Sequence, residues 1–400
     1  MNSSQIKHFN YIFTGTGLST LMTVYKMVLS GKFTEKSILL LDDSQKKSND
    51  RTWCFWAEKE TMWNSIVSKK WDSALFANED FKRDLELEPY QYNQIRGIDF
   101  YNFAFEAISK ESNITFLNEK VTDINELESH VFVGTEENRY TCDYLFNSIY
   151  TKGFVQSQTK YPVLQQHFVG WFVKTEDEVF NPEQATFMDF SVQQKGNTRF
   201  MYVLPTSKTE ALVEYTLFSE NLLSKEEYEK EIQLYLQKLG ADKFEIIKKE
   251  QGSIPMTCYP FWKKNTARVL NIGTAGGWTK ASTGFTFRNS DKKSSELVEF
   301  LNPSPETSGS LRMTTVSLKM SSFHKKNRFW FYDLLLLDIL YRHNELGSPI
   351  FSSLFKKGNP ALVFKFLDEE TSLLQDVKVI LKCPKMPFIK ALFRVIFLSK

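Results

Sequence analysis

One carboxylate stands among apolar residues in the segment that runs from Ala211 to Phe218. If this segment is a strand, its side chains alternate, so Leu212, Glu214 and Thr216 share one side. Burial among apolar neighbours raises a carboxyl pKa and keeps the acid protonated near neutral pH, as a general acid requires. The pattern therefore indicates an acid–base residue at Glu214, and it leaves open a solvent-facing glutamate on an edge strand.

A glycine loop near the start of the chain has the residue types that bind phosphate. Gly15 and Gly17 allow backbone N–H groups to approach a pyrophosphate at the helix N-terminus that Leu18 begins. The third small position of this fingerprint, which sets close packing between helix and strand, is Thr20 rather than glycine or alanine. A glycine-rich turn without a ligand is the alternative interpretation.

The elements around this loop form a βαβ unit. Residues 10–13 and 38–41 predict buried parallel strands, and residues 18–29 predict the helix between them, which Gly31 ends. Asp42 follows the second strand directly, where an acidic residue accepts hydrogen bonds from a ribose. The unit predicts a dinucleotide-binding domain.

A second small-residue loop comes much later in the chain. The predicted strand 269–272 leads into a turn whose small residues are Gly273, Ala275 and Gly276, and Thr283-Gly284 follows. An NAD-binding domain does not need such a return, whereas a two-domain flavoprotein uses it to contact the phosphates and the ring of the flavin. A simple tight turn is the alternative.

Between the two loops the pattern changes. Residues 48–92 are expected to be loop-like and aromatic, residues 160–220 to be β-rich and residues 224–239 to form an amphipathic helix, and the last hundred residues look mainly helical. We therefore predict an α/β two-domain flavoprotein with a Rossmann-like FAD-binding domain, a β-rich substrate domain and a helical C-terminal region. The expected ranges are 1–65 for the FAD-binding βαβ unit and loop, 66–90 for an excursion to the substrate side, 91–160 for the FAD-binding domain continued, 161–255 for the substrate domain, 256–300 for the return and 301–400 for the helical region.

Composition excludes several function classes. The net charge of +2 gives no indication of nucleic-acid binding, and the four separated cysteines predict neither a metal site nor a disulfide framework. The polar N-terminus lacks a signal region, and no window reaches the roughly 18 apolar residues that span a bilayer. The 35 phenylalanines fit an aromatic core or a greasy cavity equally.

These motifs together resemble the bacterial lycopene β-cyclase family, and the resemblance covers most of the chain. The segments that carry it are the first glycine loop, Arg51-Thr52-Trp53, Gln166-His167-Phe168-Val169-Gly170-Trp171, Phe187-Met188-Asp189, Leu212-Val213-Glu214-Tyr215-Thr216, Gly252-Ser253-Ile254-Pro255-Met256 and the return loop from Ala275-Gly276 to Thr283-Gly284.

The resemblance implies a flavoprotein whose reduced FAD does no net redox work, with NADPH as a reductant of the flavin. It places a catalytic carboxylate at Glu214, while Tyr215 stands at the second acidic position of the motif. Asp189 is a further candidate for a second carboxylate, with a strand-end aspartate as the alternative. Arg51 is a candidate contact to a phosphate or to the flavin. The acidic run 366–371 resembles the plant form of the motif, but we interpret it as structural.

The implied substrate, lycopene, is insoluble in water, so access from a membrane is expected. The tail from Asp376 to Lys400 mixes apolar and basic residues, which fits a cytoplasmic protein attached peripherally to the inner face of the membrane, and equally a packed helix with a solvated basic face. Two other functions remain open: an FAD-dependent monooxygenase, epoxidase or reductase acting on an isoprenoid, and a non-catalytic carotenoid-binding flavoprotein.

Overall fold

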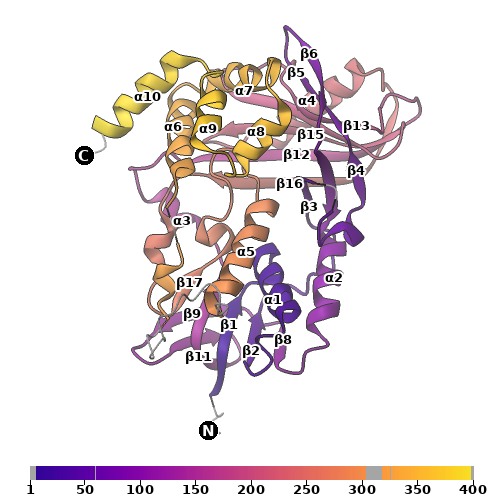
Figure 1. Ribbon diagram of the computed structural model, residues 1–400. Coiled ribbons are helices and arrows are strands. Elements are labelled where there is room, and N and C mark those ends of the chain that lie inside the picture. The colour runs from indigo at the N-terminus through magenta and orange to yellow at the C-terminus, as the bar shows by residue number, and fades with distance from the viewer. Residues whose placement is uncertain (1–5, 59, 303–317, 325, 398–400) are drawn as a thin grey trace.

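The computed structural model describes residues 6–58, 60–302, 318–324 and 326–397, which form two large sheets, a small third sheet and surrounding helices (Figure 1). The strands are β1 Lys7–Thr14, β2 Ile38–Leu41, β3 Thr52–Glu58, β4 Lys69–Trp71, β5 Ser73–Ala77, β6 Lys82–Glu86, β7 Tyr90–Arg96, β8 Ile114–Leu117, β9 Val121–Glu126, β10 Val131–Thr135, β11 Arg139–Asn147, β12 Leu164–Thr175, β13 Gln184–Asp189, β14 Thr198–Pro205, β15 Glu210–Ser219, β16 Phe244–Met256 and β17 Val269–Asn271. The α-helices are α1 Leu18–Ser30, α2 Gly97–Ile108, α3 Lys152–Gln156, α4 Lys225–Lys238, α5 Phe287–Leu301, α6 Arg328–Arg342, α7 Gly347–Lys356, α8 Pro360–Leu367, α9 Leu373–Ile380 and α10 Lys385–Phe397.

The first sheet contains the predicted βαβ unit. Its order is β8-β2-β1-β11-β10-β9, with β17 beside β11, and β8, β2, β1, β11 and β17 run parallel. All four side chains of β2 are buried, as expected for a parallel strand covered on both faces. The predicted strand 38–41 is therefore confirmed, and so is the helix at α1, which ends at the left-handed Gly31.

Helix α5 follows the return loop and packs against α1. The hydroxyls of Ser19 and Ser290 are 2.8 Å apart, and the Lys26 ammonium lies 2.7 Å from the Asp291 carboxylate. These contacts join segments that are more than 250 residues apart in the chain. The chain after the return loop therefore packs against the first sheet's helix α1.

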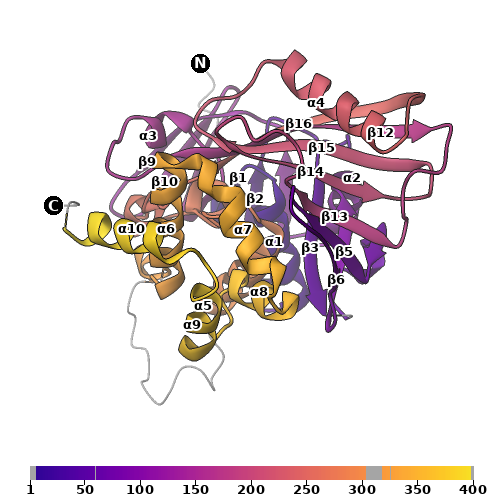
Figure 2. The same ribbon diagram turned by 90° about the horizontal axis from the view of Figure 1, so that it is seen from above.

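The second sheet has the order β16-β12-β15-β14-β13-β5-β6 and is antiparallel except between β13 and β5. Helix α4 packs on one of its faces, where Val213, Tyr215 and Leu217 form a core with Ile232 and Leu236. The opposite face meets the small β3-β7-β4 sheet and the C-terminal helices (Figures 1 and 2). Helix α4, predicted as the amphipathic helix 224–239, begins after Ser224, whose side chain accepts from the Glu227 N–H.

The expectation of a loop-like segment over residues 48–92 is wrong. Strands β3, β4 and β7 form the small sheet, and β5 and β6 extend the second sheet. The sequence of β3 shows no polar–apolar alternation because the strand is covered on both faces. Phe55 packs into the core of the first domain, and Trp56 packs into the core against the second sheet. A strand that is buried on both faces shows no polar–apolar period.

The C-terminal helices α6 to α10 lie together at one end of the second sheet (Figures 1 and 2). Among the described residues, none of the helices is long and apolar enough to cross a bilayer. Part of the region expected to be helical, 303–317, and the last residue of the basic tail, Lys400, lie outside the described residues.

Candidate active site

Glu214 lies on β15 in the middle of the second sheet. Its side chain is 7% exposed, and its neighbours across the sheet are Gly170 on β12 and Tyr202 on β14. Leu212 and Phe218 share its face and pack into the core that contains β3 and the C-terminal helices. The carboxyl group therefore points into the interface between the two halves of the molecule rather than into solvent.

A second carboxyl group meets Glu214 across one glycine. Gly170 pairs with Glu214 on one side and with Glu250 of β16 on the other. A β-carbon at position 170 would lie 2.7 Å from Cγ of Glu214, closer than such contacts allow. The missing side chain opens the space through which Glu214 and Glu250 form a side-chain hydrogen bond.

The surroundings of Glu214 favour its neutral form. Burial raises the pKa of its carboxyl well above the usual value, and the charge of Glu250 and the hydrogen bond to that residue raise it further. The neutral form is the protonation state that acid catalysis needs near neutral pH.

Three neutral polar groups surround the pair. The hydroxyls of Tyr92 and Tyr202 are 2.6 Å apart, and the thiol of Cys54 contacts both. Burial raises the pKa of each of these three groups, so all are uncharged at neutral pH. Thr52, on the same strand as Cys54, donates from Oγ1 to Oε2 of Glu250 (3.0 Å).

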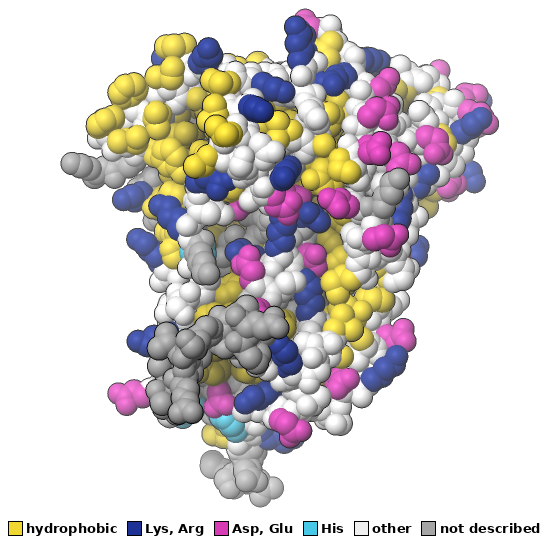
Figure 3. Space-filling view, in the orientation of Figure 1, with side chains coloured by type: hydrophobic (Ala, Val, Ile, Leu, Met, Phe, Trp, Pro, Cys, Tyr) yellow, Lys and Arg dark blue, Asp and Glu magenta, His cyan; other side chains and the backbone are white. Residues whose placement is uncertain are grey.

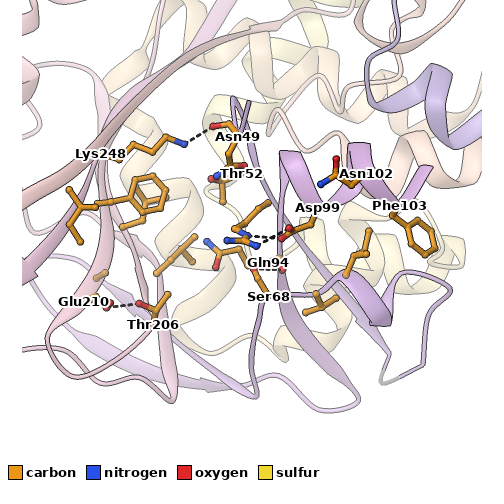
Figure 4. Close-up of a pocket in the computed structure, with 18 of the residues that line it drawn as sticks. Asn49, Thr52, Ser68, Gln94, Asp99, Asn102, Phe103, Thr206, Glu210 and Lys248 are labelled. Carbon is orange, nitrogen blue, oxygen red and sulfur yellow. Dashed lines mark hydrogen bonds and ion pairs between the residues drawn. The ribbon is translucent and has the colours of Figure 1, made fainter. Parts of the chain in front are cut away.

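A cleft of about 900 Å³ opens between α2, β7 and the second sheet, and neither Glu214 nor Glu250 is among the residues that line it. Its lining includes Thr52, the residue that binds Glu250, and Leu212, which precedes Glu214 by two positions on the same face of β15. Figure 4 shows the cleft, with Lys248 reaching the backbone oxygen of Asn49 (2.5 Å) from the opposite wall. The volume is within the range of small-molecule sites.

The two other acidic positions considered from sequence do not face Glu214. Asp189 is buried on the α4 side, where its carboxylate accepts from the Tyr235 hydroxyl (2.9 Å) and from the backbone N–H of Ser191 (2.9 Å). Asp189 therefore lies on the face of the sheet opposite Glu214, and its role as a second acid stays a prediction. Tyr215 also faces α4, and its hydroxyl accepts from Arg199 (3.2 Å). A strand places consecutive side chains on opposite faces, so an acid at position 215 would not reach Glu214.

The first glycine loop has the features of a phosphate-binding turn. Gly15 has a left-handed φ of 83°, and a β-carbon there would lie 2.4 Å from Oγ of Ser148. Gly17 caps α1 without a side-chain hydrogen bond, and nothing within 4 Å would contact a β-carbon at that position. Leu18 begins the helix, so the N-terminus of α1 opens onto free space.

The side chains of Thr20 and Asp42 lie in surroundings that the fingerprint alone does not predict. The hydroxyl of Thr20 is buried and has no hydrogen-bond partner among the described residues. Asp42 uses Oδ2 to accept from the backbone N–H (2.5 Å) and the hydroxyl (2.9 Å) of Thr16, and Lys46 lies 3.3 Å away. Asp42 therefore ties the glycine loop to β2, and its contact with a ribose stays a prediction.

The return loop lies against the first glycine loop. A β-carbon at Gly273, where φ is 58°, would lie 3.1 Å from Oγ of Ser19 on α1. Ala275 is buried, and a β-carbon at Gly276 would lie 2.2 Å from the backbone oxygen of Asn271. Only small residues fit at these glycines, and the return loop lies against the first turn of α1.

Thr283 and Gly284 continue the return loop onto the second sheet. A β-carbon at Gly284, where φ is 71°, would lie 2.0 Å from Oε1 of Gln166 on β12. Among the described residues, the buried Oε1 of Gln166 and the buried Oγ1 of Thr283 have no hydrogen-bond partner. Gln166 shares a face of β12 with Gly170, four residues or roughly 13 Å along the strand.

These residues fit a flavin nucleotide. The free N-terminus of α1 suits a pyrophosphate, and the unpartnered Gln166 and Thr283 suit a polar ring at the boundary between the two halves. Arg51 is exposed near the end of β2, where Asp42, Asp50 and Arg51 all act on the pKa of Tyr101. Arg51 thus lies on the nucleotide side of the molecule.

The acidic segment 366–371 ends helix α8 and is a structural anchor. Asp368 accepts from Nε1 of Trp56 (2.9 Å) and from Arg288 (2.9 Å), while Glu369 pairs with the buried Lys280 (2.8 Å) of the return loop. Asp333 of α6 also pairs with Lys280 (2.9 Å). These bonds fix the C-terminal helices to the return loop, which agrees with the structural interpretation of the segment.

Sequence reasoning missed Glu250, Gly170 and Tyr202. The family resemblance includes the run that begins at Gly252, but Glu250, two positions earlier, looks like one acid in a strongly charged strand. Only the pairing of β12 with both β15 and β16 brings Glu250 to Glu214. The one local signal was the glycine at position 170 inside a strand, which often marks a close approach.

Many solved structures share this fold, among them the following three. A geranylgeranyl bacteriochlorophyll reductase-like protein from Thermoplasma acidophilum has a TM-score of 0.60 at 10% identity, covering 98% of this chain and 100% of that chain. The p-nitrophenol 4-monooxygenase PnpA from Pseudomonas putida DLL-E4 has a TM-score of 0.57 at 12% identity, covering 96% and 98%. A variant of the halogenase PltM in complex with FAD has a TM-score of 0.57 at 12% identity, covering 92% and 83%. The chain therefore has the two-domain α/β fold of flavoproteins with a Rossmann-like FAD-binding domain.

The sequence places the chain more closely within this class. The family model described as "Lycopene cyclase protein" matches residues 11–393, so the chain belongs to the lycopene cyclase family. No curated protein sequence matches the chain.

Proposed function

We propose that this protein closes β-rings on the ends of lycopene, giving γ- and then β-carotene, by acid–base chemistry without net redox change. The observation that carries the proposal is the buried Glu214, whose carboxyl pKa is raised well above its usual value. Leu212, two positions before it on the same face of β15, lines a cleft between the two halves. Membership of the lycopene cyclase family supports the same reaction.

The reaction needs one proton to be given and one to be taken back. Glu214 donates its proton to the terminal double bond, a C–C bond forms to close the ring, and the resulting cation loses a proton from a ring carbon to the carboxylate. Substrate and product are isomers, so no electrons are transferred. The apolar residues Phe168, Phe172 and Leu212 on the same sheet face keep water from the cation.

Reduced FAD would be held by the two glycine loops, with Gly15, Gly17, Leu18 and Thr20 on one side and Gly273, Ala275, Gly276, Thr283 and Gly284 on the other. When bound, a reduced flavin supplies negative charge that stabilises a cation in a site of low dielectric. We propose NADPH as the reductant, Arg51 as a phosphate or flavin contact and Asp42 as the ribose contact.

The protein would take its substrate from the inner face of the cytoplasmic membrane. Large apolar side chains on α9 and α10 are exposed, among them Leu374 (78%) and Phe393 (59%). They gather where the C-terminal helices lie in the space-filling view (Figure 3). Lys378, Lys385 and Lys390 lie among them and suit anionic lipid headgroups. Arg394 does not, because it pairs with Asp338 (2.5 Å).

Flotation with vesicles tests this attachment. The protein is expected to float with vesicles of anionic lipid and less with neutral ones, and the double variant Leu374→Glu, Phe393→Glu is expected to stay at the bottom of the gradient. Binding by the double variant equal to that of the wild type would contradict the proposed surface.

Expression in a lycopene-accumulating bacterium, followed by pigment analysis, tests the proposed reaction. Ring formation should appear as conversion of red lycopene to orange-yellow carotenes. With purified protein, conversion should continue without oxygen once the flavin is reduced, and NADPH should not be consumed in proportion to product. Oxygen consumption or stoichiometric NADPH use would instead identify a monooxygenase or a reductase, and binding of lycopene without conversion would identify a non-catalytic binding protein.

A further inference from the structure

We infer that Glu250 is a positioning residue for the proposed cyclisation: it faces Glu214 across Gly170, and the two carboxyl groups share one proton. This inference rests on the proposed function and concerns the same site. Glu250 supplies, from a different strand, the second acidic group that the sequence lacks at Tyr215.

The first support is the register of three adjacent strands. Glu214 of β15 and Glu250 of β16 are both partners of Gly170 on β12, so their side chains project from the same face on either side of a residue without a side chain. In an ordinary sheet, residues on alternate strands are separated by the side chain between them. The 2.7 Å approach of Glu214 Cγ to the position of a β-carbon at 170 shows that Glu214 leans into this gap.

The second support is the environment of Glu250. Thr52 of β3 donates to Oε2 of Glu250, which fixes this carboxylate from the nucleotide side. The same threonine lines the cleft, so one hydrogen bond links Glu250 to the cleft wall. A carboxylate held in this way can accept the hydrogen bond of the protonated Glu214.

The third support is the charge of the surroundings. Cys54 on β3, Tyr92 on β7 and Tyr202 on β14 face the pair and are neutral at physiological pH, because burial raises the pKa of each. Lys248, two residues from Glu250 on the same face of β16, donates to the backbone oxygen of Asn49. The causes that act on the pKa of Glu214 are burial and Glu250, and no cation is among them.

A shared proton fits the charge changes of the reaction. With one proton the pair carries a charge of −1. When Glu214 protonates the terminal double bond, the pair becomes −2 while the substrate becomes a cation, so the total local charge is constant. The repulsion between two carboxylates then favours the return of a proton from the ring carbon, which restores the starting state. One proton leaves and one returns in each ring closure.

The test is a titration of Glu214 in the complete protein. Infrared difference spectroscopy detects the C=O band of a protonated carboxyl group, and Glu214→Gln identifies the band by its loss. In Glu250→Gln the negative neighbour is absent, so the midpoint of the Glu214 band should fall by about one pH unit or more. The alkaline limb of the pH–rate profile should shift in the same direction, which a merely structural role would not produce.

A second variant acts on the geometry alone. Gly170→Ala keeps both acids but places a β-carbon between them, so it should lower the same midpoint. The matched control is Gly134→Ala, a strand glycine of the first sheet where a β-carbon meets Asp123 at 3.4 Å, an ordinary contact. A midpoint that is unchanged in Glu250→Gln would overturn the inference. If the wild type closes no ring, the proposed function fails, while the titration still decides whether the pair exists.

Discussion

The two faces of the second sheet each bury a carboxylate, and the two carboxylates have opposite surroundings. On the α4 face, Asp189 accepts hydrogen bonds from Tyr235 and from the backbone of Ser191. On the other face, Glu214 meets a second carboxyl group at Glu250, and Leu212 of the same face lines a cleft. Hydrogen-bond donors around a carboxylate stabilise its negative charge and hold the structure together. A second carboxylate in a buried site raises the pKa instead, so the first carboxyl group keeps its proton. Burial of an acid therefore does not indicate catalysis until its partner is known.

The two faces should differ most in activity when the acid on each face is replaced by its amide. Glu214→Gln removes the proton donor, so ring formation should fall by about 10²–10⁴-fold. Asp189→Asn keeps an acceptor for Tyr235, so activity should stay within about twofold while the free energy of unfolding falls by about 1 kcal/mol. Initial rates of carotene formation and urea denaturation measure the two effects. Comparable loss of activity in both variants would break the distinction between the faces.

The next largest effect concerns the cofactor at the Glu214 face. Gly284→Ala forces a β-carbon onto a left-handed residue and against Oε1 of Gln166, 2.0 Å away, so bound FAD should weaken at least about tenfold. Gly31→Ala is the matched control, because Gly31 has a similar φ of 63° but nothing within 4 Å. The control should lose about 1–2 kcal/mol of stability and keep its FAD. Fluorescence titration with FAD measures the affinity of the two variants, and equal affinities would show that the return loop does not contact the flavin.

Local sequence patterns were sufficient to predict helices, strands and turns, but not which side chains contact one another. The βαβ unit, α4 and the return loop follow from periods, caps and glycines within short windows, and β2 was predicted with its observed bounds. The face on which Asp189 lies, the use of Asp42 to hold Thr16 and the meeting of Glu214 with Glu250 depend on strands far apart in sequence. Strand β3 failed for a different reason, since the burial of Phe55 and Trp56 on opposite faces removes the period that identifies a strand. The domain boundaries themselves remain predictions.

A smaller effect should appear in the pH dependence of stability. The pKa of Glu214 is higher in the folded protein than in the unfolded chain, so the folded state binds this proton more tightly. The stabilisation is complete below the ordinary glutamate pKa and is lost as pH rises toward the folded-state pKa, by up to about 1.4 kcal/mol per pH unit. Urea denaturation of the wild type and of Glu214→Gln between pH 5 and 8 measures this slope. The variant should lose less stability with rising pH, and parallel curves for the two proteins would show that Glu214 does not hold a proton in the folded state.

The smallest effect on activity is expected from the residue next to Glu214. Tyr215→Asp restores an acid at the second position of the family motif, but the side chain points to α4, where Arg199 donates to the Tyr215 hydroxyl. The new carboxylate would pair with Arg199 rather than approach Glu214, so the rate of ring formation should change by less than about threefold, and its pH profile should not move. Tyr215→Phe is the control, because it removes the same hydroxyl without adding charge and should cost about 1 kcal/mol of stability. A shift of the pH profile in Tyr215→Asp alone would mean that charge on the α4 face reaches Glu214 through the sheet, and the two faces would then have to be treated as one electrostatic site.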